Sequence, residues 1–245
     1  FIAPEIFPLI SKLSGKFEFS NGFVPSVIFS SFSVVSPQEK RKIAHRLPAA
    51  REFIAANKLN EHFPGARHKH LGLIVQGGLY NTLIRTLQQF DLSDAFGLSS
   101  LSILVLNVTY PLVPAELTDF CKDKKAVLLL EEGQPEYIEQ ELALMLRRLD
   151  LQTPVHGKDM LPSGGEYTAE VMAEGLLKFL DKHQPQAVPE STRAWLQGNS
   201  QRRKQVQTLL GTPIPARPPS MCIGCPERPV FSALKLAQEK VGPVH

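Results

Sequence analysis

Two cysteines near the end of the chain carry the clearest chemistry in the sequence. Cys222 and Cys225 stand three positions apart, with Gly224 between them and Pro226 after them. Two thiolates at this spacing can hold one metal centre, because the turn between them points both sulfurs the same way. The only other cysteine, Cys121, lies far earlier in a helix-like stretch, so an all-cysteine centre needs ligands from outside this sequence.

The cysteine pair allows three interpretations. We favour two ligands of an iron–sulfur cluster, and half of a zinc site is the next alternative. A redox dithiol is disfavoured, because the pair follows a proline-rich stretch rather than a strand of a βαβ unit. The chain begins at Phe1 rather than Met and ends 20 residues after Cys225. We therefore expect an internal fragment of a larger protein.

Two further groups follow predicted strands, at the edge where open α/β sheets bind ligands. Gly77 and Gly78 lack the Gly-x-Gly-x-x-Gly spacing and the Gly-Lys-Ser/Thr ending of phosphate-binding loops, so a tight turn is favoured over a phosphate cradle. Glu131 and Glu132 suit either acid–base work or hydrogen bonds that tie loops together, and the second role is favoured. Gly77, Gly78 and Glu131 are the candidates for cofactor binding, and no residue is assigned as catalytic.

The elements that would position these residues alternate between strand and helix. Nearly continuous apolar runs predict strands covered on both faces, and apolar residues at three- and four-residue steps predict helices. Strands are expected at 71–75, 101–108, 126–130 and around Val155, with helices at 79–90, 114–120, 135–149 and 168–180. This order predicts an α/β fold with an open, mostly parallel sheet.

The flanking segments complete the expected organisation. The pattern predicts a helical arm over 38–60, and it places His68, Lys69 and His70 in a solvated turn rather than a metal clamp. One short helix is expected near 195–209. The domains are expected at 1–70 (N-terminal segment and helical connector), 71–183 (α/β domain), 184–216 (linker) and 217–245 (start of a cofactor-binding domain).

Composition narrows the class of protein. The 245 residues are 43% hydrophobic and 21% charged, as in ordinary globular proteins. A net charge of +3 is too small to indicate a nucleic-acid partner. Three cysteines make no disulfide framework and favour the cytoplasm, and no apolar run is long enough for a membrane helix.

Four segments in order resemble one enzyme family, the indolepyruvate:ferredoxin oxidoreductases of alpha-subunit type. The segment 217–235 around the two cysteines resembles the opening of that family's thiamine-diphosphate domain. The segments 75–81, 127–140 and 157–166 resemble its strand-turn-helix entry, its acidic strand end and the loop before its last helix. The resemblance covers roughly residues 38–245.

The resemblance implies a fold and an activity. The middle region would be similar to the transketolase C-terminal domain. The intact enzyme would decarboxylate an aryl 2-oxo acid on thiamine diphosphate, pass electrons through 4Fe–4S clusters to ferredoxin, and transfer the acyl group to coenzyme A. Cys222 and Cys225 would be cluster ligands. No Gly-Asp-Gly motif with a following Asn occurs here, so the thiamine diphosphate and Mg²⁺ site would lie outside this fragment, which alone would be inactive.

The expected partners are ferredoxin, the remaining domains of the same chain and a beta subunit, in an oligomer. Two alternatives stay open beside the enzyme. The first is a noncatalytic scaffold whose sheet serves assembly, and the second is a zinc-binding module built on the two cysteines.

Overall fold

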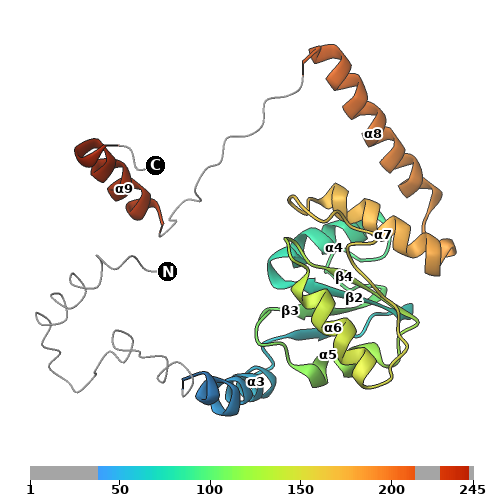
Figure 1. Ribbon diagram of the computed structural model, residues 1–245. Coiled ribbons are helices and arrows are strands. Elements are labelled where there is room, and N and C mark those ends of the chain that lie inside the picture. The colour runs from blue at the N-terminus through green and yellow to red at the C-terminus, as the bar shows by residue number, and fades with distance from the viewer. Residues whose placement is uncertain (1–37, 213–226, 243–245) are drawn as a thin grey trace, which may run out of the picture. The chain divides into compact units, whose positions relative to one another are not determined.

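The computed structural model describes residues 38–212 and 227–242 (Figure 1). The chain divides into two units, Phe1–Leu196 and Gln197–His245. The first unit contains the sheet and the helices that cover it. The second contains the outer part of α8 (Glu190–Leu210), which begins in the first unit, and α9 (Arg228–Val241). Cys222 and Cys225 lie outside the described residues.

A five-stranded mixed sheet forms the centre of the first unit. Its order is β1-β3-β2-β4-β5, in which β1 pairs antiparallel with β3 and the other three pairings are parallel. The strands are β1 (Glu61–Phe63), β2 (His68–Gln76), β3 (Leu101–Leu106), β4 (Ala126–Leu130) and β5 (Val155–His156). The predicted α/β class and mostly parallel sheet are therefore confirmed.

Helices cover both faces of the sheet, so the central strands are buried on both sides. On one face, alternate residues of β2, β3 and β4 pack against α4 (Tyr80–Gln89) and α7 (Ala169–His183). The intervening residues pack against α5 (Pro114–Cys121) and α6 (Tyr137–Arg148) on the other face (Figure 1). Every residue of β3 and of β4 is buried, which explains their unbroken apolar sequences.

The helix ends follow ordinary capping chemistry. The Thr168 hydroxyl accepts a hydrogen bond from the Val171 N–H at the start of α7, as the sequence predicts, and Glu170 lies in the first turn. The four inward residues predicted for α7 are all fully buried: Met172, Leu176, Phe179 and Leu180. Helix α6 begins at Tyr137 rather than at Pro135, because a carboxylate described below occupies its first free N–H groups.

The amino-terminal helical arm is present and ends sooner than predicted. Residues 38–41 are helical, η1 (Lys42–Arg46) is a π-turn, and α3 (Leu47–Ala56) completes the helix. Ile54 is the buried residue of α3, while Phe53 is largely exposed. The Arg51 guanidinium donates a hydrogen bond to the Leu112 carbonyl oxygen at 2.9 Å, which ties the arm to the loop after β3.

The sequence prediction was wrong for His68, Lys69 and His70. They form the first residues of β2 rather than a turn, because the His68 N–H bonds to the Ser100 carbonyl oxygen at 2.7 Å. The ladder to β3 then shifts register between His68 and Gly72. Such an irregularity hides the start of a strand from a simple alternation pattern.

The segment after α7 is more ordered than a linker with one short helix. Residues Pro185–Ala187 form the 3₁₀ turn η3, and α8 starts at Glu190, ahead of the predicted helix. Thr192 is buried, and its hydroxyl donates to the Gln89 carbonyl oxygen at the end of α4, at 2.9 Å. The first turn of α8 is therefore anchored to the α/β unit.

Candidate ligand cleft at the carboxyl edge of the sheet

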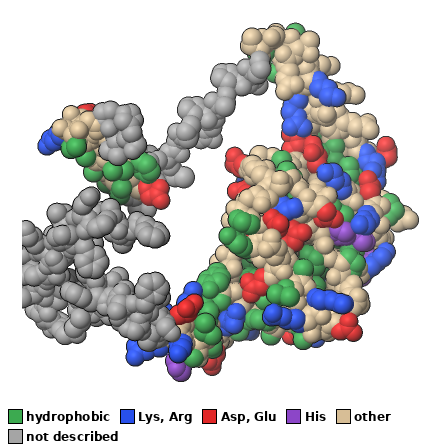
Figure 2. Space-filling view, in the orientation of Figure 1, with side chains coloured by type: hydrophobic (Ala, Val, Ile, Leu, Met, Phe, Trp, Pro, Cys, Tyr) green, Lys and Arg blue, Asp and Glu red, His purple; other side chains and the backbone are tan. Residues whose placement is uncertain are grey.

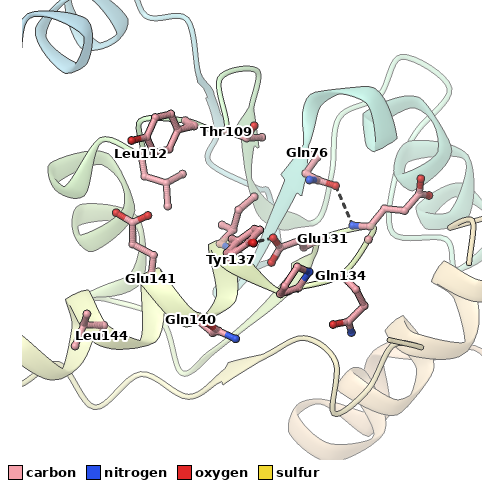
Figure 3. A pocket seen from close by; sticks show the side chains of 14 residues that line it. Gln76, Thr109, Leu112, Glu131, Gln134, Tyr137, Gln140, Glu141 and Leu144 are labelled. Atoms are coloured by element: carbon pink, nitrogen blue, oxygen red, sulfur yellow. Dashed lines mark hydrogen bonds between the residues drawn. The ribbon is translucent and has the colours of Figure 1, made fainter. Parts of the chain in front are cut away.

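A cleft of about 750 Å³ opens where β2, β3 and β4 end. Gln76 ends β2, Tyr110 and Leu112 come from the loop after β3, and Glu131 to Pro135 follow β4. Helix α6 supplies the far wall with Tyr137 and Glu141 (Figure 3). The cleft thus lies at the edge where open α/β sheets bind ligands.

Gly77 has a packing reason for being glycine, whereas Gly78 has none. A Cβ atom on Gly77 would stand 2.4 Å from the Asn107 Oδ1 atom, while a Cβ on Gly78 meets nothing within 4 Å. The Asn107 amide donates in turn to the Leu59 carbonyl oxygen and the Glu61 carboxylate. Gly77 therefore lets the ends of β2 and β3 approach closely. Neither glycine lines the cleft, and their role in cofactor binding stays a prediction.

Glu131 caps helix α6. Its side chain is buried, and its two carboxylate oxygens accept hydrogen bonds from the N–H groups of Ile138 at 2.9 Å and Glu139 at 3.1 Å. A carboxylate at this position satisfies free donors and complements the positive end of the helix dipole. Its oxygens are thus engaged within the protein.

Glu132 ties three loops together. Its N–H donates to the Gln76 side-chain oxygen at 2.9 Å, drawn as a dashed line in Figure 3. Its carboxylate accepts from the Tyr167 N–H at 2.6 Å. Of the two roles considered for this carboxylate pair, the hydrogen bonds support the structural one.

Lys158 and Tyr167 reinforce the same junction, and sequence reasoning did not single them out. The Lys158 ammonium donates to the Glu131 carbonyl oxygen at 2.6 Å and to the Tyr167 hydroxyl at 2.8 Å. That hydroxyl donates to the Pro162 carbonyl oxygen at 2.7 Å. The segment 157–166 was noted only for its family resemblance, and no local pattern shows that its lysine turns back to β4.

A chain of polar side chains lies beside β5. One His156 ring nitrogen contacts the Asp159 carboxylate at 2.6 Å, and the other contacts the His183 ring at 2.9 Å. Burial lowers the pKa of His183, and His156, Lys182 and Lys125 lower it further. For Asp159, burial raises the pKa, but the hydrogen bonds from His156 and the Gly157 N–H more than offset this and leave the pKa lowered.

Cys121 is not suited to metal binding or nucleophilic chemistry. It is fully buried in α5, and burial raises the pKa of its thiol to about 12. The thiol therefore stays protonated at neutral pH. Within residues 38–212 and 227–242, no group of three or more His, Cys, Asp or Glu side chains is arranged to hold a metal ion. The same residues include no helix long and apolar enough to span a membrane.

Fold and cleft together define an open α/β domain with a ligand-sized hollow at the carboxyl ends of its parallel strands. No protein-family model matches the chain. The chain is similar to the indolepyruvate oxidoreductase subunit IorA of Methanothermobacter thermautotrophicus, with 27% identity over 213 residues, which are 82% of this chain and 28% of the relative. The IorA subunit of Pyrococcus abyssi is 29% identical over 141 residues, 58% of this chain and 20% of the relative.

These matches confirm the resemblance found in the sequence. A third subunit of the same name, from Methanothermobacter marburgensis, is 23% identical over 83% of the chain. The chain spans between 20% and 29% of the length of the curated relatives it matches.

Proposed function

We propose that this chain is part of a subunit of an oxidoreductase that decarboxylates aryl 2-oxo acids such as indolepyruvate. The similarity to IorA subunits over 58% to 83% of the chain carries this proposal. In the reaction, a 2-oxo acid anion and coenzyme A yield an acyl-coenzyme A, carbon dioxide, one proton and two electrons. Two oxidised ferredoxins accept the electrons one each.

Within such an enzyme, the α/β domain would act as a positioning domain, similar to the transketolase C-terminal domain. Thiamine diphosphate would supply the carbanion chemistry from a site outside this chain. The residues described here hold strand ends and loops in register: Glu131 fixes α6, Glu132 joins β2 to the loop before α7, and Lys158 closes the junction. Both oxygens of the Glu131 carboxylate are engaged in these bonds, so Glu131 is not available for proton transfer.

The residues at the carboxyl edge do not fit the phosphates of coenzyme A. The charged side chains that line the cleft are Glu131, Glu132 and Glu141, and none of the described Lys, Arg or His residues lines it. Carboxylates repel a diphosphate. Coenzyme A would therefore bind outside this cleft.

Cys222 and Cys225 would provide two thiolate ligands of a 4Fe–4S cluster that carries electrons toward ferredoxin. The test is to prepare the full-length subunit anaerobically with its partner subunit, as wild type and as Cys222→Ala and Cys225→Ala. Both variants should lose the iron and sulfide of one cluster and most indolepyruvate-dependent ferredoxin reduction. Cys121→Ala is the matched control, because that thiol is buried and protonated.

The alternatives give different results in this experiment. If Cys222→Ala kept all its iron and full activity, the cluster assignment would be wrong. A colourless wild-type protein with stoichiometric zinc would favour the zinc-binding module. Wild-type protein with no indolepyruvate-dependent reduction of ferredoxin would leave the scaffold as the remaining function.

A further inference from the structure

The walls of the carboxyl-edge cleft combine exposed apolar surface with one free carboxylate. Tyr110 is 63% exposed, Tyr137 69% and Leu144 48%, which is high for large side chains beside a cleft. Glu141 reaches from α6 toward Leu112 (Figure 3). Within the described residues, no hydrogen bond or ion pair engages the Glu141 carboxylate. Glu141 therefore differs from Glu131 and Glu132, whose carboxylates both accept backbone hydrogen bonds.

The amino-terminal end of α6 would normally attract an anionic ligand, but the Glu131 carboxylate already occupies it. The amino-terminal end of α6 lies at the cleft, which Tyr137 and Ile138 line, and the N–H groups of such helix ends bind phosphates and carboxylates in many proteins. Here the Glu131 carboxylate already accepts from Ile138 and Glu139. With the helix end neutralised and Glu141 unpaired, the cleft favours positive charge.

The aromatic walls favour the same sign of charge. The face of a tyrosine ring attracts cations, and the Lys42 ammonium already lies 5.8 Å from the centre of the Tyr110 ring. Tyr137 presents a second exposed ring on the same cleft, and it precedes Glu141 by four residues on α6, which puts both on one face of the helix. A guanidinium suits this pairing better than an ammonium, because it stacks on a ring while it donates two parallel hydrogen bonds to a carboxylate.

We propose that this cleft is the docking site for an arginine side chain within a segment of a partner polypeptide. The guanidinium pairs with Glu141 and stacks on Tyr137, and apolar neighbours of that arginine cover Tyr110 and Leu144. A polypeptide is favoured over a small cation because so much of the apolar wall is exposed. Arginine and tyrosine are also the residues that contribute most at protein interfaces.

The probe is the tripeptide acetyl-Leu-Arg-Leu-amide, titrated into the isotopically labelled full chain while backbone amide signals are followed. Signals of residues 109–112 and 131–141 should shift together. The same peptide with citrulline in place of arginine is neutral and nearly the same shape, and it should bind at least about tenfold more weakly, as expected for loss of a charge-assisted pair. Adenosine 3′,5′-bisphosphate should leave these signals unchanged.

Variants separate the two parts of the site. Glu141→Gln should weaken peptide binding about tenfold, a typical effect of losing one good ion pair. Tyr137→Leu should weaken it, and Tyr137→Phe should restore it, because the ring is what stacks. The matched control Asp123→Asn changes the same charge at an exposed site between α5 and β4, and it should bind like wild type.

Three outcomes would overturn the proposal. Equal binding of the arginine and citrulline peptides would show that the positive charge of the arginine does not contribute to binding. Equal affinities of Glu141→Gln and Asp123→Asn would remove Glu141 from the site. Shifts of the same signals by the bisphosphate would make this an anion site. None of these results depends on iron content or on indolepyruvate turnover, so failure here and failure of the proposed function are distinguishable.

Discussion

Glu131 shows how one side chain joins a strand end to a helix. It is the first residue after β4, and its carboxylate bonds the second and third residues of α6. The loop between β4 and α6 contains Gly133, which has a positive φ of 104°, and Pro135. The carboxylate therefore does the work that a serine or aspartate does directly before most helices.

Replacing this carboxylate should lower stability. Glu131→Gln keeps the shape but removes the charge and one acceptor oxygen, so the free energy of unfolding should fall by about 1–2 kcal/mol. Urea denaturation followed by circular dichroism measures the change. Glu52→Gln is the control, because Glu52 is exposed on α3, and its effect should stay within about 0.5 kcal/mol. Equal effects of the two substitutions would contradict the capping role.

The sequence indicated where Glu131 lies but could not decide what it does. Its position after an apolar run placed it at the sheet edge, because strand periodicity is local. Its partners, the N–H groups of residues 138 and 139, become visible only when the start of α6 is known. Lys158 was missed for the same reason, since its contacts with Glu131 and Tyr167 join separate loops.

Helix α7 shows how tight packing overrides helix propensity. Gly175 lies in its middle and is buried, and a Cβ atom there would stand 2.3 Å from Leu161 Cδ2. Leu161 is itself buried in the core, so its side chain has little room to move. A glycine at a helix centre normally costs about 1 kcal/mol relative to alanine, and here it permits the contact between helix and loop.

Gly175→Ala should therefore destabilise the domain despite the better helix propensity of alanine. The clash should lower the free energy of unfolding by about 1–3 kcal/mol, as overpacked cores do. Gly198→Ala in α8 is the matched control, because a Cβ there meets only the end of Arg202, at 4.0 Å. That substitution should raise helicity measured by circular dichroism. A more stable Gly175→Ala protein would show that Leu161 moves aside freely.

At the level of elements, the sequence predicts long regular segments better than short ones. The apolar runs of β3 and β4 and the inward face of α7 were assigned from periodicity alone, because burial on both faces or one face leaves a repeating pattern. Strand β1 was not predicted. It has three residues, Glu61, His62 and Phe63, and its pairing with β3 across some forty positions leaves no local signal.

Charged and titratable side chains lie at both edges of the sheet in the α/β unit. Carboxylates line the cleft at the carboxyl edge. At the amino edge, Lys125 joins β2 to the end of α7: its backbone N–H donates to the His70 carbonyl oxygen at 2.7 Å, and its ammonium donates to the His183 carbonyl oxygen at 3.0 Å. Figure 2 shows histidine side chains, in purple, beside blue basic side chains on this unit.

The free energy of unfolding should fall as the pH falls below about 6.5, the usual pKa of a histidine side chain. Burial lowers the pKa of His62, His68 and His183, and neighbouring cations or histidines lower each further. The unfolded chain then binds protons that the folded chain resists, so protonation favours unfolding. Urea midpoints at pH 7.5, 6.5 and 5.5 should decrease in that order.

A single substitution tests this explanation. His183→Gln removes one of the three groups and should flatten the decrease between pH 7.5 and 5.5. His45→Gln changes an exposed histidine of η1 and should leave the decrease as in wild type. If both variants followed the wild-type curve, the pH dependence would have to come from other groups.

The brevity of the outermost strands has a consequence for assembly. Within the described residues, the sheet is bounded by β1, with three residues, and β5, with two. Long, exposed edge strands can pair through their backbone groups with a strand of another chain. This domain offers almost no such template, so neighbours in a larger complex must recognise its helices and loops through side chains, and the same brevity protects it from runaway strand addition.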